Sequence, residues 1–424
     1  MNAFRAVGSQ PNPHALAALV KASETYAIVA SRDIVDVRGI KLWAQGQAVS
    51  ASLHQRLLER RLERPLETCL EAEDGVTAVT LADDLKAFIE SDNPLGLAVR
   101  PWAGMLLDQI RHLPLHSVAQ LMLTAAVASR PGTLPHAVAG MALAGAMMVS
   151  RGRDSPGDVR LAMLGGLLHD LGEVYIHPQY LDYTESLNLV GHKHLVVHPR
   201  VGQLLLMHLT DYPRTLSMAV GEHHERMDRS GYPARLHGDE VSELGRLLGV
   251  MEVALGTARL ERAPLACASF ALRVVPGEFD TRWASFICEA AEQAKEDLSC
   301  GADAAGVDLD LQLADIDRQL GEARQLALDM QEQRRTARVT DVVNHALERL
   351  QRLRHAWNAL GLWAAPASAE APSSECFELQ LAQAELSQRM RNFQRECLLL
   401  SDGLSEAEKF RLSPLWRGLF DGKV

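Results

Sequence analysis

Two pairs of neighbouring metal-ligand side chains stand out in this sequence. His169 and Asp170 lie side by side in LLHDLGE, and His223 and His224 begin the segment HHERMDRSGYP, which ends at Pro233. Imidazole nitrogens and carboxylate oxygens are ligands of divalent metal ions, and a carboxylate such as that of Asp170 can bridge two ions. Two such pairs in one chain predict a binuclear hydrolase centre.

The predicted helices suggest how these pairs would bind. Successive side chains on an α-helix point about 100° apart, so neighbouring ligands face two different ions more easily than one. His169 and Asp170 follow the apolar run 161–168, which predicts a buried helix with the pair at its inner end. We therefore expect His223 and His224 to serve mainly different ions.

Histidines are concentrated in the middle of the chain. Ten of the 16 lie between His136 and His237, far more than an even spread over 424 residues would place there. His136 opens an apolar run, and His198 precedes Pro199 and a periodic apolar segment. Taken alone, His136 would more simply be a cap or packing residue. Burying so many ionisable groups without a counter-charge is costly, so the cluster favours a shared metal centre.

The order of these motifs resembles the HD-GYP subgroup of the HD superfamily. The motifs are His136, His169-Asp170, His198-Pro199, HHERMDRSGYP and the acidic residue in GVMEVALG. The resemblance covers about residues 134–258. It implies an all-helical domain that binds metal ions and hydrolyses phosphodiesters, usually cyclic di-GMP. A lone His-Asp pair would be weak evidence, whereas HHE followed by a GYP loop is specific.

Carried over residue by residue, the resemblance assigns metal ligands and a substrate-binding loop. The ligands would be His136, His169, Asp170, His198, His223, His224 and Glu252. Asp170 would bridge, and Glu252 stands where the family normally has aspartate. Gly231, Tyr232 and Pro233 would belong to the loop, with glycine allowing unusual dihedral angles and proline stiffening the next residue. The ligand types favour two divalent ions, iron or manganese rather than zinc.

Two departures from the family pattern bear on activity. Glu173 replaces the usual lysine after the His-Asp pair, so an anion stands where a cation would contact phosphate. Arg229 replaces a glycine before Ser-Gly-Tyr-Pro and adds a guanidinium suited to substrate phosphate. We therefore count Asp170, Glu173 and Arg229 as candidate catalytic residues. Glu173 would either slow turnover by repelling phosphate, so that Glu173→Lys speeds it up, or ligate a further ion.

Length and composition indicate several domains and restrict the partners. A chain of 424 residues suggests about three domains, and 47% hydrophobic residues are enough for real cores. The net charge of −11 argues against nucleic acid or an acidic membrane surface as the main partner. We expect a cytoplasmic location, because we find no signal peptide, the apolar run 137–149 is too short to span a membrane, and the six cysteines lack CxxC spacing.

The predicted fold class is mainly α. We expect a flexible N-terminus (1–25), a small α+β module (26–83), an HD-GYP phosphohydrolase domain (84–301) and a C-terminal helical extension (302–424). Residues 26–42 predict a hairpin or short strands, because they are rich in β-branched residues and interrupted at 36–39. A helix should follow from Ser50 to Arg61.

The C-terminal extension carries apolar residues at heptad-like spacing. One stripe runs from Val339 to Leu360 and another from Leu386 to Leu400, with a linker of alanine, proline and serine at 364–374. This pattern predicts an antiparallel hairpin or bundle. It would either bring in a second chain, as a homodimer or with a protein partner, or pack on the HD-GYP domain.

Three functions agree with these features. The first is metal-dependent hydrolysis of cyclic di-GMP to the linear dinucleotide or GMP. The second is a catalytically weak or inactive receptor or scaffold that binds a cyclic nucleotide and signals through its helical C-terminus. The third is hydrolysis of another cyclic dinucleotide or of a phosphomonoester.

Overall fold

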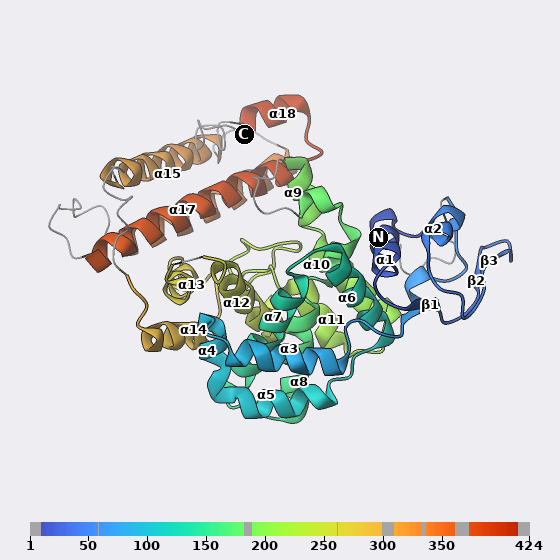
Figure 1. The fold of residues 1–424 in the computed structure, drawn as a ribbon. Helices are drawn as coiled ribbons and strands as arrows, with labels where there is room; N and C mark the ends of the chain where they lie inside the picture. The colour runs from blue at the N-terminus through green and yellow to red at the C-terminus, as the bar shows by residue number, and fades with distance from the viewer. Residues whose placement is uncertain are drawn as a thin grey trace. The chain divides into compact units, whose positions relative to one another are not determined.

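The computed structural model describes residues 10–57, 59–181, 189–260, 262–298, 309–331, 336–360 and 373–413. The fold is mainly helical, which confirms the predicted class, and short strands occur near its N-terminal end (Figure 1). The chain divides into two compact units. The first comprises Met1–Leu187, His194–Ala258 and Asp280–Phe286, and the second comprises Asn188–Lys193, Arg259–Phe279 and Ile287–Val424.

The first unit begins with helix α1 (Pro13–Ala22), where the sequence analysis expects a flexible start over residues 1–25. The side chain of Asn12 caps this helix by accepting hydrogen bonds from the backbone N–H groups of His14 and Ala15. Its apolar face is buried, and it packs on α6 (Ser117–Ser129) and η4 (Leu171–Tyr175). The structure differs from the expectation because this cap and this tertiary contact order the segment.

A small α+β module follows, as predicted. Its elements are β1 (Ile28–Ala30), β2 (Ile34–Val35), β3 (Lys41–Trp43), α2 (Ala51–Leu57), η1 (Leu66–Thr68) and β4 (Leu70–Ala72). β1 pairs with β4 and β2 with β3, both antiparallel, so the predicted hairpin is present. The helix α2 is shorter than the predicted span from Ser50 to Arg61. Glu59 has a left-handed φ of 61°, which a continuing α-helix does not tolerate.

Helices make up the rest of the first unit. They are α3 (Ala78–Glu90), α4 (Pro94–Val99), α5 (Ala103–Gln109), α6, α7 (Thr133–Ser150), α8 (Pro156–Leu168), α10 (His198–Leu209), α11 (Arg214–Glu222) and α12 (Glu243–Thr257). Short 3-10 turns join them: η2 (Arg100–Trp102), η3 (Ile110–His112), η4, η5 (Pro178–Tyr180) and η6 (Gly238–Glu240). α7 contacts α3, α4, α8 and α12, and therefore forms the centre of this unit.

Helices α7 and α8 approach each other closely at two glycines. A Cβ atom added at Gly166 would lie 2.2 Å from the carbonyl oxygen of Gly140, so only glycine allows this contact. Because the two helices run antiparallel, the contact places the first turn of α7, with His136, beside the end of α8, with His169.

By length and composition alone, α7 could span a membrane. It has 18 residues, which is longer than the apolar run 137–149 judged from sequence. However, 67% of it is buried by other parts of the protein. We therefore interpret α7 as a core helix.

The second unit contains the helices α13 (Pro264–Arg273), α15 (Leu309–Gln331), α16 (Ala337–Ala359), α17 (Ser373–Leu400) and α18 (Glu406–Leu412). Two more helices, α9 (Leu189–Leu195) and α14 (Thr281–Ala294), belong partly to each unit. Helices α15, α16 and α17 pack together as a three-helix bundle. In Figure 1, α15 and α17 run side by side, and α16 packs against both. Arg354 pairs with Asp317, and Nε2 of His345 lies 3.0 Å from a carboxylate oxygen of Glu396, so α16 is antiparallel to both neighbours.

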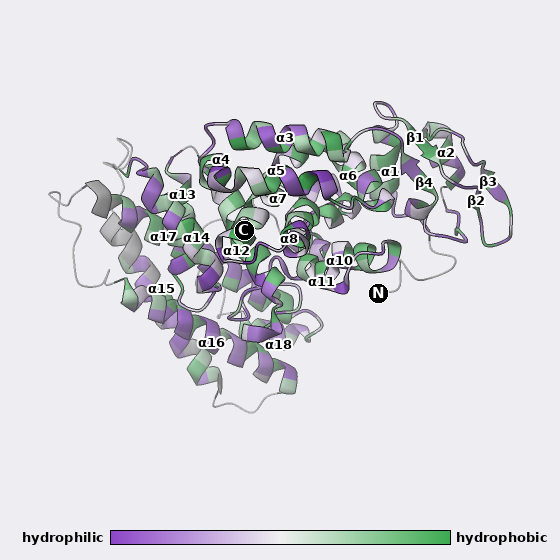
Figure 2. Ribbon diagram, turned by 90° about the horizontal axis from the view of Figure 1, so that it is seen from below, coloured by the Kyte–Doolittle hydropathy of each residue, from purple (hydrophilic) through white to green (hydrophobic). Residues whose placement is uncertain are grey.

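The two predicted heptad stripes are buried inside this bundle. Val343, Leu350 and Trp357 of α16 belong to the same core as Leu386 and Phe393 of α17. Many residues of α16 on the side seen in Figure 2 are hydrophilic, as expected for a solvated outer face. This packing agrees with the predicted hairpin or bundle. Most of the predicted linker 364–374 lies outside the described residues, and α17 already begins at Ser373.

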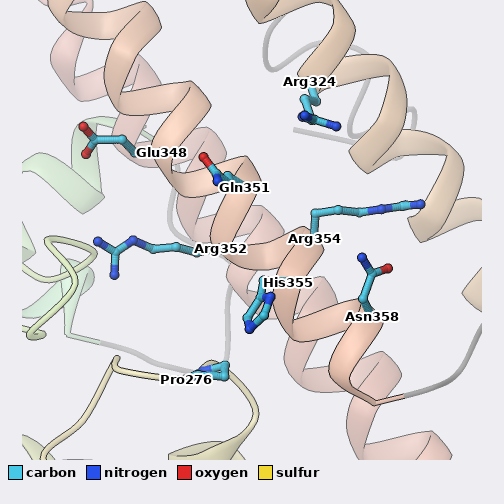
Figure 3. A pocket seen from close by; sticks show the side chains of 8 residues that line it. All are labelled: Pro276, Arg324, Glu348, Gln351, Arg352, Arg354, His355 and Asn358. Atoms are coloured by element: carbon cyan, nitrogen blue, oxygen red, sulfur yellow. The ribbon is translucent and has the colours of Figure 1, made fainter.

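The boundary of the predicted HD-GYP domain at residue 301 differs from the observed division. Residues 259–279 and the chain from 287 onward cluster with the second unit. This unit also has a groove of about 590 Å³ lined by charged side chains of α15 and α16 (Figure 3). Arg354 in this groove pairs with Asp317, and Glu348 adds a carboxylate. The groove is therefore of mixed charge, unlike the clusters of cations that bind phosphate.

Candidate metal centre

The ends of helices supply most of the candidate ligands. His136 lies in the first turn of α7, His169 is the C-cap of α8, His198 is the first residue of α10, His223 is the C-cap of α11, and Glu252 lies within α12. Asp170 and His224 follow directly after two of these ends. At Gly172, a Cβ atom would lie 2.1 Å from the carbonyl oxygen of His198. This glycine therefore lets the chain after Asp170 lie directly against the start of α10.

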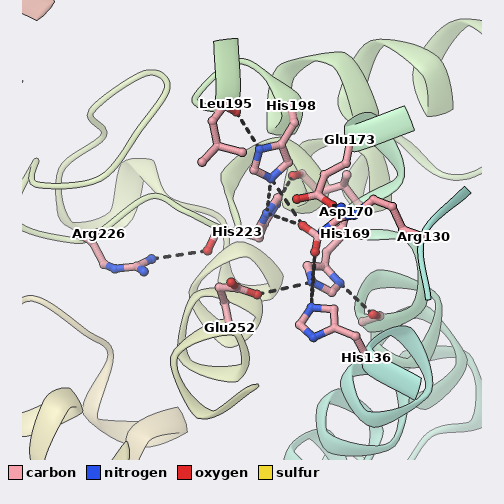
Figure 4. A network of polar contacts seen from close by, with 12 residues as sticks. Arg130, His136, His169, Asp170, Glu173, Leu195, His198, His223, Arg226 and Glu252 are labelled. Atoms are coloured by element: carbon pink, nitrogen blue, oxygen red, sulfur yellow. Dashed lines mark hydrogen bonds and ion pairs between the residues drawn. The ribbon is translucent and has the colours of Figure 1, made fainter. Parts of the chain in front are cut away.

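The ligand atoms form two clusters that meet at Asp170 (Figure 4). One cluster contains Asp170, His198, His223 and His224, and the other contains His136, His169 and Glu252; within each, the ligand atoms lie within 4.8 Å of one another. Oδ2 of Asp170 lies 3.3 and 3.2 Å from Nε2 of His136 and His169. Oδ1 lies 3.4 and 3.5 Å from Nε2 of His198 and His223. The two carboxylate oxygens thus face two different histidine pairs, which is the geometry that bridging requires.

Backbone hydrogen bonds orient three of the imidazoles. Nδ1 of His169, His198 and His223 lies 2.9, 2.8 and 2.7 Å from the carbonyl oxygen three residues earlier in the chain. A carbonyl oxygen only accepts, so Nδ1 carries the proton in each ring. Nε2 is therefore the atom that each ring offers to a metal ion inside the cluster, and an ion that binds there replaces any proton on it.

The spacing of the Nε2 atoms fits bound metal ions. They face each other at 3.1 Å in the pair His136 and His169 and again in the pair His198 and His223. Burial lowers the pKa of both rings in the second pair, but for His198 the attraction of Asp170 outweighs burial, so its Nε2 can donate a proton to Nε2 of His223. A bound metal ion would displace that proton. Two histidine nitrogens held about 2.0–2.1 Å from one ion, at roughly a right angle, are about 3 Å apart.

One carboxylate oxygen in the centre has an ion-pair contact with an imidazole but no hydrogen bond. Within the described residues, Oε2 of Glu252 is a buried atom without a hydrogen-bond donor, and it lies 3.4 Å from Nε2 of His169. Leaving a buried charged oxygen unpaired costs about 1–3 kcal/mol or more. A metal ion in the second cluster would satisfy it, so the longer side chain of Glu252 reaches the cluster from the position where the family resemblance places an aspartate.

Charges within the centre set the protonation states. Burial lowers the pKa of His169, but the attraction of Asp170 and Glu252 outweighs burial and raises that pKa well above its usual value. Burial raises the pKa of Asp170, but His169 and the other imidazoles outweigh it and hold that pKa well below its usual value. Burial, together with His223 and His198, holds the pKa of His224 well below its usual value. Asp170 is therefore ionised and His224 neutral, as metal binding requires.

His223 and His224 do not divide between the two clusters, which does not favour the prediction that they serve different ions. Both belong to the cluster with Asp170 and His198, and their ring centroids are 4.2 Å apart. The reason is that α11 ends at Glu222. The pair lies in the turn after the helix, where the regular divergence of about 100° per residue no longer applies.

The predicted substrate-binding loop packs against His224. The ring of Tyr232 stacks on that imidazole with centroids 4.6 Å apart, and the backbone N–H of Tyr232 donates to the His224 carbonyl oxygen at 3.1 Å. A cis peptide bond joins Tyr232 to Pro233. At Gly231, a Cβ atom would lie 2.3 Å from the backbone nitrogen of Arg226, so close approach requires this glycine. Arg229, with φ 69°, has the unusual dihedral angle that the sequence analysis assigned to Gly231.

Sequence reasoning missed the residue that holds this loop in place. The carboxylate of Glu225 accepts hydrogen bonds from the backbone N–H groups of Ala234, Arg235 and Leu236 at 2.6, 3.2 and 3.0 Å. Glu225 is buried and directly follows His224 in the chain. The signal was present as the glutamate of the HHE motif.

Glu173 has a cationic partner that the sequence analysis also missed. Its buried carboxylate forms an ion pair with Arg130, whose Nη2 atom also donates to the Leu181 carbonyl oxygen at 3.2 Å (Figure 4). Glu173 belongs to neither ligand cluster in the described part of the chain, which gives no support to its predicted alternative role as a ligand of a further ion. Arg229, the predicted source of compensating charge, is exposed. Nothing in the local pattern around Arg130 marks it as a partner of Glu173.

Comparison with known families agrees with this geometry. Residues 106–264 match the HD domain family. This part of the chain is similar to an HD domain. All seven candidate ligands lie within the matched residues, whereas α1, the strands and the three-helix bundle lie outside the HD domain.

Several curated proteins resemble the HD domain and its surroundings. The 3'3'-cGAMP-specific phosphodiesterase 3 of Vibrio cholerae is 31% identical over 101 residues, which are 23% of this chain and 22% of that protein. A cyclic di-GMP phosphodiesterase of Pseudomonas aeruginosa is 31% identical over 195 residues, 45% of this chain and 46% of that protein. A cyclic di-GMP phosphodiesterase of Vibrio cholerae is 32% identical over 114 residues, 25% of this chain and 23% of that protein. The chain thus spans less than half of each relative, and no solved structure matches it.

Proposed function

We propose that this chain is a metal-dependent phosphodiesterase that hydrolyses cyclic di-GMP to the linear dinucleotide or GMP. The observation that carries the proposal is the position of Asp170, whose two oxygens face two histidine pairs in a centre built for two ions. Binuclear centres of this kind are suited to in-line displacement at phosphorus. The names of two similar proteins, both cyclic di-GMP phosphodiesterases, support this substrate.

We assign the seven ligands as follows. His136, His169 and Glu252 would hold one divalent ion, His198, His223 and His224 the other, and Asp170 would bridge them. Imidazole and carboxylate ligands favour iron or manganese over a thiolate-rich zinc site. Two divalent ions bring four positive charges, of which Asp170 and Glu252 offset two, so the centre can accept an anionic diester.

Each residue then has a definite task. When bound, the two ions would polarise the phosphoryl oxygens and lower the pKa of a water molecule. Asp170 keeps the two sites at a fixed separation, and the carbonyl oxygens behind His169, His198 and His223 hold their rings in the required tautomer. Tyr232 covers the face of His224 and shields that ligand from water.

The Glu173 substitution does not argue against hydrolysis as strongly as the sequence suggests. The pair with Arg130 compensates its charge, so a phosphate near Asp170 meets a neutral pair and not an isolated carboxylate. Glu173 therefore acts on substrate only through Arg130, and we regard it as a positioning residue.

A direct assay tests the proposal. The purified chain is loaded with manganese or iron, and cyclic di-GMP and its products are separated by chromatography. We expect linear dinucleotide or GMP to form, and none with Asp170→Asn. A wild-type chain that binds cyclic di-GMP without forming product would establish the alternative, a receptor or scaffold.

A second substrate is favoured by a specific observation. Two of the similar proteins are named 3'3'-cGAMP-specific phosphodiesterases, so the same assay should include 3'3'-cGAMP. Faster hydrolysis of 3'3'-cGAMP than of cyclic di-GMP would reassign the substrate without changing the reaction.

We also propose a cytoplasmic location and no direct role for nucleic acid or a membrane, in keeping with the net charge of −11 and the burial of α7. A homodimer or protein partner through the C-terminal helices stays a prediction. The burial of both heptad stripes within one unit leaves less apolar surface for it than the sequence suggests.

A further inference from the structure

A cavity of about 290 Å³ lies beside the proposed metal centre. One wall is formed by His14, Ala17, Ala18 and Lys21 of α1, which lies outside the HD domain. The opposite wall includes Arg130 at the end of α6 and the bridging carboxylate Asp170. The HD domain therefore does not enclose this cavity alone.

Hydrogen bonds fix α1 at both ends across the cavity. Nδ2 of Asn12 donates to the carbonyl oxygen of Tyr175 in η4 at 3.3 Å, and Nζ of Lys21 donates to the carbonyl oxygen of Ser129 in α6 at 3.3 Å. Between these points, Leu16 and Leu19 are buried and hold the helix in place. The two partner segments are the ones that carry Glu173 and precede Arg130. The wall is thus part of the folded unit.

Charged and apolar side chains both line the cavity. Arg130, Glu173 and Asp170 are charged, while Ala17, Ala18 and Ile176 are apolar. The two alanines have small side chains, which leave space in front of α1. A flat apolar group attached to a phosphate would find both kinds of lining here.

His14 adds a planar side chain at this wall. Burial, with His177 and His194, lowers its pKa, so the imidazole is neutral near pH 7. Its edge packs against the ring of His177 with centroids 5.0 Å apart. A neutral, oriented ring of this kind can stack on a nucleobase.

We propose that this cavity receives one purine base of the cyclic dinucleotide, with Arg130 beside the phosphate that faces Asp170. The inference rests on the proposed function and adds α1 to the substrate site. The volume is just below the range of about 300–1,000 Å³ typical of small-molecule pockets, so it suits one nucleoside unit and not the whole dinucleotide. α1 then determines specificity from outside the HD domain.

Filling the cavity tests this proposal. In Ala17→Phe, an aromatic ring would enter from an exposed position on α1, and in Ala18→Leu a larger side chain would enter from a buried one. Val20→Phe places the same ring on α1 away from the cavity and is the matched control. The probe is GMP, which has one base and one phosphate but no diester bond, and its binding to the metal-loaded chain is measured by calorimetry.

We expect Ala17→Phe and Ala18→Leu to weaken GMP binding by about tenfold or more, and Val20→Phe to stay near the wild type, with metal content unchanged in all three. GMP affinity that is the same in wild type, Ala17→Phe and Ala18→Leu would overturn the pocket. Cyclic di-GMP hydrolysis by the wild type, measured in parallel, separates the two proposals. If the wild type hydrolyses cyclic di-GMP and the variants bind GMP as tightly as it does, only the pocket proposal is refuted. If the variants weaken GMP binding but the wild type does not hydrolyse cyclic di-GMP, only the proposed activity is refuted. If neither result is found, both proposals are refuted.

Discussion

Both units bury charged side chains, but the two units differ in the partners that these side chains have. In the second unit Arg389 is buried, and its guanidinium donates to a Glu278 oxygen at 2.9 Å and to the Ala271 carbonyl at 2.7 Å, and also pairs with Glu385. In the first unit, the Nε2 atoms of His198 and His223 face each other at 3.1 Å, and Oε2 of Glu252 has no donor among the described residues.

This difference separates structural from functional polar clusters. Around Arg389 the protein supplies its own counter-charges, so the cluster is complete without a ligand. Around Asp170 the ligand atoms converge on two common points, and without an ion only protonated imidazoles offset the carboxylates. A buried cluster that its own chain leaves unsatisfied therefore indicates a bound ion.

The largest effect that this comparison predicts is at Asp170. Asp170→Ala should remove both ions and bring hydrolysis to background, because one carboxylate faces both histidine pairs. Loss of residues that merely orient metal ligands lowers affinity about 10–100-fold, so loss of the bridge should exceed that. Metal content by mass spectrometry and hydrolysis by chromatography measure it. Asp154→Ala, an exposed aspartate of the same unit, is the control, and two ions retained in Asp170→Ala would contradict the assignment.

Arg389 should show the opposite pattern. Arg389→Ala leaves the buried carboxylate of Glu278 without its main partner, so the free energy of unfolding should fall by about 3–5 kcal/mol. Metal content should not change. Chemical denaturation measures the loss, and Arg391→Ala, exposed on the same helix, should stay within about 0.5 kcal/mol of the wild type. A loss of metal from Arg389→Ala would break the distinction between the two clusters.

The next prediction concerns the ion pair of Glu173 and Arg130, which lies beside the proposed metal centre. The sequence alone predicts that Glu173→Lys speeds hydrolysis. The structure predicts the reverse, because the new ammonium would face Arg130 in a buried place, and we expect hydrolysis to fall about tenfold. The double variant Arg130→Glu with Glu173→Lys should recover part of that loss, with a coupling free energy of about 0.5–3 kcal/mol. Additive effects of the two changes would show that the ion pair is irrelevant to activity.

Arg229 is expected to give the smallest effect. Its φ of 69° is left-handed, a conformation that costs a non-glycine residue about 1–2 kcal/mol, so Arg229→Gly should raise the free energy of unfolding by about 1 kcal/mol. Urea unfolding measures the change. Since the side chain is exposed, hydrolysis should stay near the wild-type rate. A large loss of hydrolysis would restore Arg229 as a phosphate-binding residue.

The sequence by itself indicated the candidate ligands and the elements that present them. His136, His169, Asp170, His198 and His223 could be named because residue type and the ends of apolar helical runs are local properties. The hairpin around β2 and β3 and the heptad stripes of α16 and α17 were visible for the same reason. Each depends on a period of two or about 3.6 residues within one segment.

The tertiary structure alone decided which side chains meet across long separations. Arg130 and Glu173 lie 43 residues apart and pair because α6 packs on η4. Gly231 is required by the backbone of another turn, and α1 becomes a cavity wall through hydrogen bonds to Tyr175 and Ser129. Such contacts depend on how helices pack around one another, which local hydrophobic patterns do not specify. For that reason the sequence identified the candidate metal ligands, but only the fold showed which charge compensates Glu173.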